Sequence, residues 1–137
     1  MHSMKKLCLA LLSCSTPLVS AEPALTAAVN DAFETYCALP ARLIPILDKA
    51  RDKASADAAA KELNNELPAI YETRDKLHNM PQLTPAQNQA VRISYGQRMR
   101  EEWAGMYSAI ARVRKANCFQ SVEFARAFRL MCMMIEK

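Results

Sequence analysis

The chain has 137 residues, 51% of them hydrophobic, and carries 18 Lys and Arg against 14 Asp and Glu, a formal net charge of +4. This length suits one domain, and so small a net charge excludes nucleic-acid binding driven by overall charge. Only two glycines occur, and no alternating apolar–polar run reaches strand length. The abundance of helix-favouring residues therefore predicts an all-α fold.

The N-terminal segment, residues 1–21, has the three-part layout of a secretory signal peptide. Lys5 and Lys6 form a short basic start, and the apolar run that follows is shorter than the roughly 20 residues of a transmembrane helix. Residues 19–21 read Val-Ser-Ala, the small-x-small pattern before a cleavage site. We therefore expect a periplasmic or secreted protein with no transmembrane span, whose mature part, 22–137, is a single helical domain.

A second interpretation concerns the same segment. Residues 11–14 read Leu-Leu-Ser-Cys, which resembles the lipobox that directs lipid attachment to a cysteine. Under this alternative, the protein is a lipoprotein anchored at Cys14. Plain cleavage after Ala21 is favoured, because the apolar run before Cys14 is short for a lipoprotein signal.

The first helix is predicted over residues 25–50 by apolar residues that alternate at steps of four and three, a coiled-coil-like stripe. Pro40 and Pro45 interrupt this segment, and each removes a backbone donor. Because the stripe keeps its register across both prolines, we expect one bent helix rather than two. The stripe consists of Leu25, Val29, Ala32, Tyr36, Leu39, Leu43, Ile46 and Ala50.

The second helix is predicted to begin near Ser55, taken as its N-cap, and to bend at Pro68. Residues 79–82 read Asn-Met-Pro-Gln, which indicates a turn. The predicted inward stripe consists of Ala56, Ala60, Leu63, Leu67, Ile70 and Leu77.

The third helix is the longest, from about Pro85 to Ala116, and a fourth follows from Ser121 as N-cap. The third stripe consists of Val91, Tyr95, Met99, Trp103, Met106, Ile110 and Val113. The fourth stripe consists of Phe124, Phe128, Met131 and Ile135.

Four amphipathic helices with short connections predict an up-down four-helix bundle, with an elongated antiparallel helical hairpin that dimerises as the alternative. The mature part holds three cysteines, and an oxidising compartment favours a disulfide between two of them. In the bundle, Cys37 and Cys132 lie at matching depths on antiparallel neighbours, so we expect them to pair. If Pro40 folds the start of the first helix over the top, the pair is instead Cys37 and Cys118.

Charge is unevenly distributed along the mature chain. Residues 22–82 carry 7 basic and 10 acidic side chains, whereas residues 83–137 carry 9 basic and 4 acidic ones. The simplest interpretation is that neighbouring faces of one bundle attract each other. The alternative is a basic binding face on the third helix. Its candidate residues are Arg92, Arg98, Arg100, Arg112 and Arg114.

No pattern in the sequence predicts catalysis or a cofactor. The mature part has one histidine, His78, in a polar turn region, and nucleophilic catalysis needs a base beside the nucleophile. A haem held by His78 and Met99 or Met106 is disfavoured, because these positions lie far apart along a bundle. Residues 131–134 read Met-Cys-Met-Met, but consecutive helical residues point in different directions, and we expect Met131 and Met134 to fill the core.

Residues 83–87 read Leu-Thr-Pro-Ala-Gln. Thr84 and Gln87 can form a capping box at the start of the third helix, with Leu83 placed for a hydrophobic staple. The same letters resemble the L-T-x-x-Q motif of the Spy/CpxP family of periplasmic helical proteins. That resemblance implies a chaperone or envelope-stress role, although members carry the motif twice and this chain carries it once.

These observations predict an exported, non-enzymatic helical protein of the bacterial envelope, with a binding or scaffold role and no metal or cofactor. The expected partner is an unidentified protein or, under the family resemblance, an unfolded client, and not nucleic acid. A homodimer is compatible with the pattern.

Overall fold

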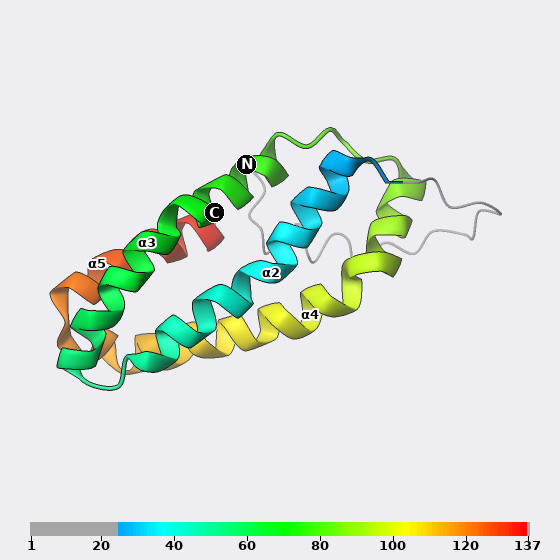
Figure 1. Cartoon of the computed structure of the whole chain (residues 1–137). Helices are drawn as coiled ribbons and strands as arrows, with labels where there is room; N and C mark the ends of the chain where they lie inside the picture. The colour runs from blue at the N-terminus through cyan, green and yellow to red at the C-terminus, as the bar shows by residue number, and fades with distance from the viewer. Residues whose placement is uncertain (1–24, 137) are drawn as a thin grey trace.

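The computed structural model describes residues 25–136, and the signal-peptide and lipobox predictions lie outside this range. The described chain forms four α-helices and one short left-handed turn, which confirms the all-α prediction (Figure 1). None of these helices is long and apolar enough to cross a membrane. The elements are α2 (Ala27–Lys49), α3 (Lys53–His78), α4 (Pro85–Lys115), η1 (Asn117–Gln120) and α5 (Val122–Glu136).

The helices α2 and α4 lie side by side and run in the same direction (Figure 1). Two ion pairs fix their register: Arg98 Nη1 lies 2.9 Å from Glu34 Oε2, and Arg112 Nη2 lies 3.3 Å from Asp48 Oδ1. Both pairs join residues 64 positions apart. A constant sequence offset along two helices means that they are parallel.

The helices α2 and α3 form an antiparallel hairpin. Lys76 Nζ lies 2.8 Å from Asp31 Oδ2, and Lys49 Nζ lies 2.8 Å from Glu62 Oε2, so residue numbers fall along α3 as they rise along α2. In turn, α5 packs on α3 and runs parallel to it (Figure 1).

The molecule is therefore one helical hairpin, α2–α3, stacked on a second, α4–α5. This corrects the predicted arrangement, in which the first and last helices were antiparallel neighbours. The reason lies in the connection over residues 79–84, which carries the chain from the end of α3 across to the start of α2 (Figure 1). There α4 begins beside α2 and runs along it, so α5 returns along α3.

The predicted disulfide is a second correction. Cys37, Cys118 and Cys132 are all free thiols in the described chain. Cys37 is buried in α2, which packs on α3 and α4, whereas Cys132 is buried in α5, which packs mainly on α3. The predicted pair assumed that α2 and α5 are direct neighbours, and the stacking of the two hairpins separates them.

Side-chain caps set the helix starts. The N-cap of α3 is Asp52, whose carboxylate accepts from the backbone N–H of Ser55, while the Ser55 hydroxyl interacts with the backbone N–H of Asp52. Ser55 was predicted as the N-cap and is instead the third helical residue of this capping box. The predicted box at α4 is confirmed, with Thr84 and Gln87 bonded reciprocally at 3.0 and 3.1 Å.

The prediction of one continuous helix through Pro40 and Pro45 is confirmed. A proline at position 40 cannot donate to the carbonyl of Tyr36, four residues earlier, which would leave a buried acceptor unpaired. The indole Nε1–H of Trp103, on α4, donates to that carbonyl oxygen at 3.1 Å. The two rings also stack, with centroids 4.6 Å apart, so a contact between helices compensates for the proline.

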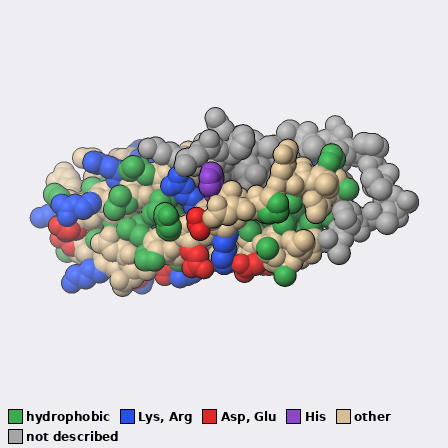
Figure 2. Space-filling model, turned by 90° about the horizontal axis from the view of Figure 1, so that it is seen from above, with side chains coloured by type: hydrophobic (Ala, Val, Ile, Leu, Met, Phe, Trp, Pro, Cys, Tyr) green, Lys and Arg blue, Asp and Glu red, His purple; other side chains and the backbone are tan. Residues whose placement is uncertain are grey.

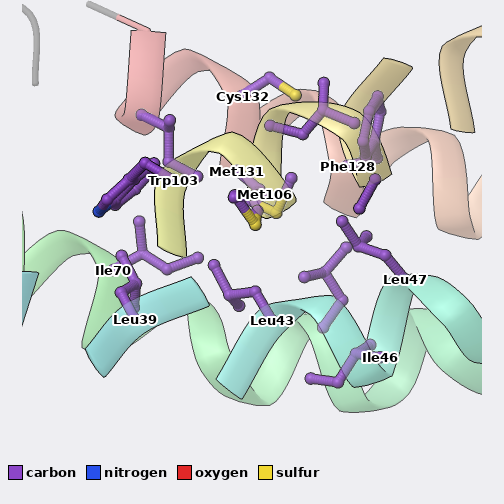
Figure 3. Packing of buried hydrophobic residues seen from close by; sticks show 14 of the residues in the cluster. Leu39, Leu43, Ile46, Leu47, Ile70, Trp103, Met106, Phe128, Met131 and Cys132 are labelled. Atoms are coloured by element: carbon purple, nitrogen blue, oxygen red, sulfur yellow. The ribbon is translucent and has the colours of Figure 1, made fainter. Parts of the chain in front are cut away.

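The core draws side chains from all four helices (Figure 3). Met106 of α4 and Met131 of α5 lie together above Leu43 of α2 in the close-up, with Trp103 and Leu39 to one side (Figure 3). The predicted inward stripes are buried with few exceptions, since Leu25, Leu67 and Leu77 are only partly covered. One chain thus buries its own stripes, as the bundle prediction requires.

Candidate interaction surface on α5

The outward side of α5 carries apolar side chains among arginines. Val122, Leu130 and Met133 expose 68%, 44% and 43% of their surface, and Arg126 and Arg129 are exposed between them. At 100° per residue these five positions fall on one side of the helix. We call them the α5 outer face. The opposite side of α5 is buried and consists of Phe124, Ala127, Phe128, Met131, Cys132 and Ile135.

Local interactions hold α5 in place. The Ser121 hydroxyl oxygen accepts from the backbone N–H of Phe124 at 3.1 Å and donates to the Asp57 carboxylate on α3. The predicted N-cap is thus confirmed, and it also ties the helix start to the neighbouring hairpin. The outer face is therefore presented by an ordered helix rather than by a loop.

The turn η1 precedes α5 and has an unusual backbone. Its four residues, Asn117–Gln120, all have positive φ, between 50° and 59°. None is glycine, and this left-handed region disfavours side chains. Phe119 is held from two sides, by the Arg112 guanidinium 5.8 Å above its ring and by the edge of Phe124. Packing therefore holds the turn that reverses the chain into α5.

The α5 outer face is positively charged. Arg126 lies 3.6 Å from Glu123, an exposed pair one turn apart, and no ion pair joins Arg129 to a carboxylate within residues 25–136. The other acid of α5, Glu136, has its carboxylate 2.9 Å from Arg114 on α4. On the face seen in Figure 2, hydrophobic side chains lie among Lys/Arg and Asp/Glu side chains.

The five arginines proposed as a basic face have different surroundings in the structure. Arg98 pairs with an acid of α2, and Arg114 with an acid of α5. Arg92 is half-buried and Arg100 is exposed. Arg112 donates to the carbonyls of Leu47 and Ala50 at the C-terminal end of α2. The simplest interpretation of the charge pattern, attraction between neighbouring faces, accounts for Arg98, Arg112 and Arg114.

The two cysteines near the second hairpin's turn are weak nucleophiles. Burial raises the pKa of the Cys132 thiol to about 11, although the nearby Arg114 opposes the shift. Burial also raises the pKa of Cys118. Because the thiolate is the reactive form, neither group is activated for nucleophilic or ligand chemistry.

The structure also places His78 and the methionines of α5, which the sequence offered as possible haem or metal ligands. His78 is exposed at the C-terminal end of α3, and no group of three metal-ligating side chains exists among the described residues. Met131 is buried in the core and Met134 packs against it, whereas Met133 faces outward. The prediction that Met131 and Met134 fill the core is therefore confirmed.

Sequence reasoning missed the α5 outer face because it looked for arginines on the longest helix. The signal was present in the spacing of Val122, Leu130 and Met133, which fall outside the inward stripe of α5. An apolar residue off the stripe is common, but three on one side of a four-turn helix form a patch.

The motif at residues 83–87 is accounted for by local structure. Thr84 and Gln87 form the capping box, and Leu83 packs against the core. Comparison of the chain with models of known families, with curated proteins and with solved structures gives no match. The resemblance to the Spy/CpxP family therefore stays a prediction.

Proposed function

We propose that the chain is an exported, non-enzymatic binding or scaffold protein of the bacterial envelope, which holds its partner against the α5 outer face. The observation that carries the proposal is the exposure of Val122, Leu130 and Met133 beside two arginines on an ordered helix. Burying apolar surface releases about 25 cal/mol per Å². A partner that covers this face therefore gains binding free energy without any rearrangement of the bundle.

Several other polar side chains are bonded to neighbouring helices, and this supports a binding role for the α5 outer face. Arg98, Arg112 and Arg114 pair with acids on neighbouring helices, and the indole N–H of Trp103 is bonded to a carbonyl of α2. These groups join helices and maintain the shape of the bundle. The α5 outer face combines three exposed apolar side chains with two exposed arginines.

The proposal is tested by photo-crosslinking in the native envelope. A benzophenone amino acid is placed singly at Leu130 or Met133, with Ile93 on α4 as the control, since it is 55% exposed. Irradiation is expected to give a discrete protein or lipid adduct at 130 and 133 and not at 93, as read by mass spectrometry. If no position gives an adduct, or all three give the same ones, the binding role of this face is refuted.

A chaperone of the Spy/CpxP type is a second candidate, favoured by the same mixture of apolar and basic groups, which suits an unfolded client. In this case the protein suppresses aggregation of an unfolding client at equimolar ratio, and Leu130→Ser with Met133→Ser abolishes the effect. Aggregation that proceeds unchanged with the wild-type protein eliminates this candidate and leaves the scaffold role intact.

A further inference from the structure

We propose that the α5 outer face docks on an anionic lipid surface. The inference rests on the proposed binding role of this face and names its partner. Val122 and Met133 mark its ends, 11 residues apart, so it forms a ridge about 16 Å long. A ridge of exposed side chains, in place of a recess, suits a broad and fluid partner.

The residue types match the two layers of a membrane interface. Val122, Leu130 and Met133 can enter the boundary between headgroups and acyl chains, where surface helices place their apolar side. Arg126 and Arg129 lie between them on the same side of α5. A guanidinium binds phosphate oxygens with two parallel hydrogen bonds while its aliphatic stem covers apolar surface. One face thus offers both interactions at once.

Charge around the face favours an anionic surface. Within α5 two basic residues, Arg126 and Arg129, belong to the outer face, and the two acidic residues, Glu123 and Glu136, do not. Of the two acids, Glu136 is turned toward Arg114 and Glu123 toward Arg126. A negatively charged bilayer strengthens binding about fivefold for each arginine near its surface.

A second copy of the chain fits this face less well. A two-fold dimer places the same patch of both copies in contact. Arg126 and Arg129 of one copy would then face those of the other, and like charges across an interface oppose association. We therefore assign the face to lipid, and the dimer becomes an outcome of the test.

The test is co-sedimentation with lipid vesicles, using the processed protein recovered from its own envelope fraction. Vesicles of neutral phosphatidylcholine are compared with vesicles that contain phosphatidylglycerol. Two variants alter the face, Arg126→Glu with Arg129→Glu, and Leu130→Ser with Met133→Ser. Matched controls, Arg100→Glu and Ile93→Ser, alter equally exposed residues of α4. All four change exposed side chains, and circular dichroism verifies that each variant is folded.

We expect the wild-type protein to bind anionic vesicles at least about tenfold more tightly than neutral ones. Each face variant should lose about tenfold or more of that affinity, whereas the controls retain it. Equal losses in face and control variants, or no binding to anionic vesicles, would overturn the lipid assignment. So would a dimer in solution that the face variants dissociate.

The two proposals fail in different ways. If vesicle binding is absent but positions 130 and 133 still crosslink to a protein, the lipid assignment is wrong and the binding role stands. If vesicle binding is absent and these positions crosslink to nothing, both are wrong. Vesicle binding together with lipid adducts at 130 and 133 supports both.

Discussion

At the scale of single residues, the contact between Trp103 and Tyr36 explains how a proline occupies the middle of α2. Pro40 leaves the Tyr36 carbonyl without a helical donor, and the carbonyl lies in the core. An unpaired buried acceptor costs about 1–3 kcal/mol. The indole of Trp103 supplies the missing hydrogen bond from α4, so the sequence tolerates Pro40 because Trp103 is there.

This account predicts energetic coupling between positions 40 and 103. Trp103→Phe removes the donor and should lower the free energy of unfolding by about 1–3 kcal/mol. In a Pro40→Ala background, the alanine N–H can bond to the Tyr36 carbonyl, and the same substitution should cost less. Urea unfolding of the four proteins in this double-mutant cycle measures the coupling. If Trp103→Phe lowers the free energy of unfolding equally in both backgrounds, the Trp103 indole does not replace the hydrogen-bond donor that Pro40 lacks. Trp103→Ala, which also empties the site, should cost about 3–5 kcal/mol.

A second residue-scale prediction concerns pH. Burial holds the pKa of the Cys132 thiol at about 11 in the folded chain, whereas an unfolded cysteine titrates near about 8.5. Between these values the unfolded state has lost the proton that the folded state keeps, so stability falls as pH rises from about 8.5 to 11. Below this window the thiol contributes no pH dependence.

Chemical unfolding at pH 8 and pH 10 tests the effect of Cys132. The wild-type protein should lose stability between the two pH values, and Cys132→Ala should lose less. Tyr95 and Cys118, whose pKa values burial also raises, leave a residual slope in both proteins. An identical slope in the two proteins would mean that the Cys132 thiol is not protonated above its usual pKa.

At the scale of elements, the left-handed turn η1 stores conformational strain. In this region a residue with a Cβ atom is destabilised by roughly 1–2 kcal/mol through steric contact with its own backbone. Glycine has no such contact, and its cost is the larger conformational entropy that it loses on folding. Gln120 is exposed and has φ of 59°. Gln120→Gly should therefore stabilise the protein by about 0.5–1 kcal/mol.

A matched substitution provides the control for η1. Gln97 is exposed inside α4, where glycine costs about 1 kcal/mol relative to alanine. Gln97→Gly should lower the thermal unfolding midpoint, while Gln120→Gly raises it. If both substitutions destabilise, the backbone at position 120 is not left-handed.

The capping box of α4 makes another element-scale prediction. Thr84→Ala removes the acceptor of the Gln87 backbone N–H and should cost about 1 kcal/mol. Thr84→Ser should retain most of the stability. Thr35→Ala is the control, because Thr35 lies inside α2 and bonds only to the preceding turn. Thermal unfolding measures both variants. If Thr84→Ala and Thr35→Ala lower stability equally, helix capping does not explain the motif.

The comparison of sequence and structure also belongs to this scale. Periodicity predicted the helices and their inward stripes because each depends on residues three and four positions apart. The N-cap of α3 was misplaced by three residues because Asp52 and Ser55 both suit a cap. Spacing along one helix carries no information about which helices are neighbours, so it could not predict the disulfide. The spacing of Val122, Leu130 and Met133 did place them outside the inward stripe of α5.

At the scale of the whole molecule, the stacking of parallel helices determines which cysteines lie close enough to form a disulfide. Cys37 belongs to α2 and Cys132 to α5, and these helices are not direct packing partners. We expect Cys37, Cys118 and Cys132 all to react with a thiol reagent in denaturant without prior reduction. The unfolding midpoint should be the same with and without reductant. A mass two hydrogens lower, mapped to Cys37 and one of the other two cysteines, would show that oxidation rearranges the hairpins.

Trp103 also gives the molecule a built-in optical reporter. It is the single tryptophan of the chain, 2% exposed, and it joins one hairpin to the other. Its emission should therefore be blue-shifted in the folded protein and move to longer wavelength when the hairpins separate, even if both hairpins remain helical. Circular dichroism reports the helices themselves, so the two signals coincide only if docking and helix formation are one cooperative event.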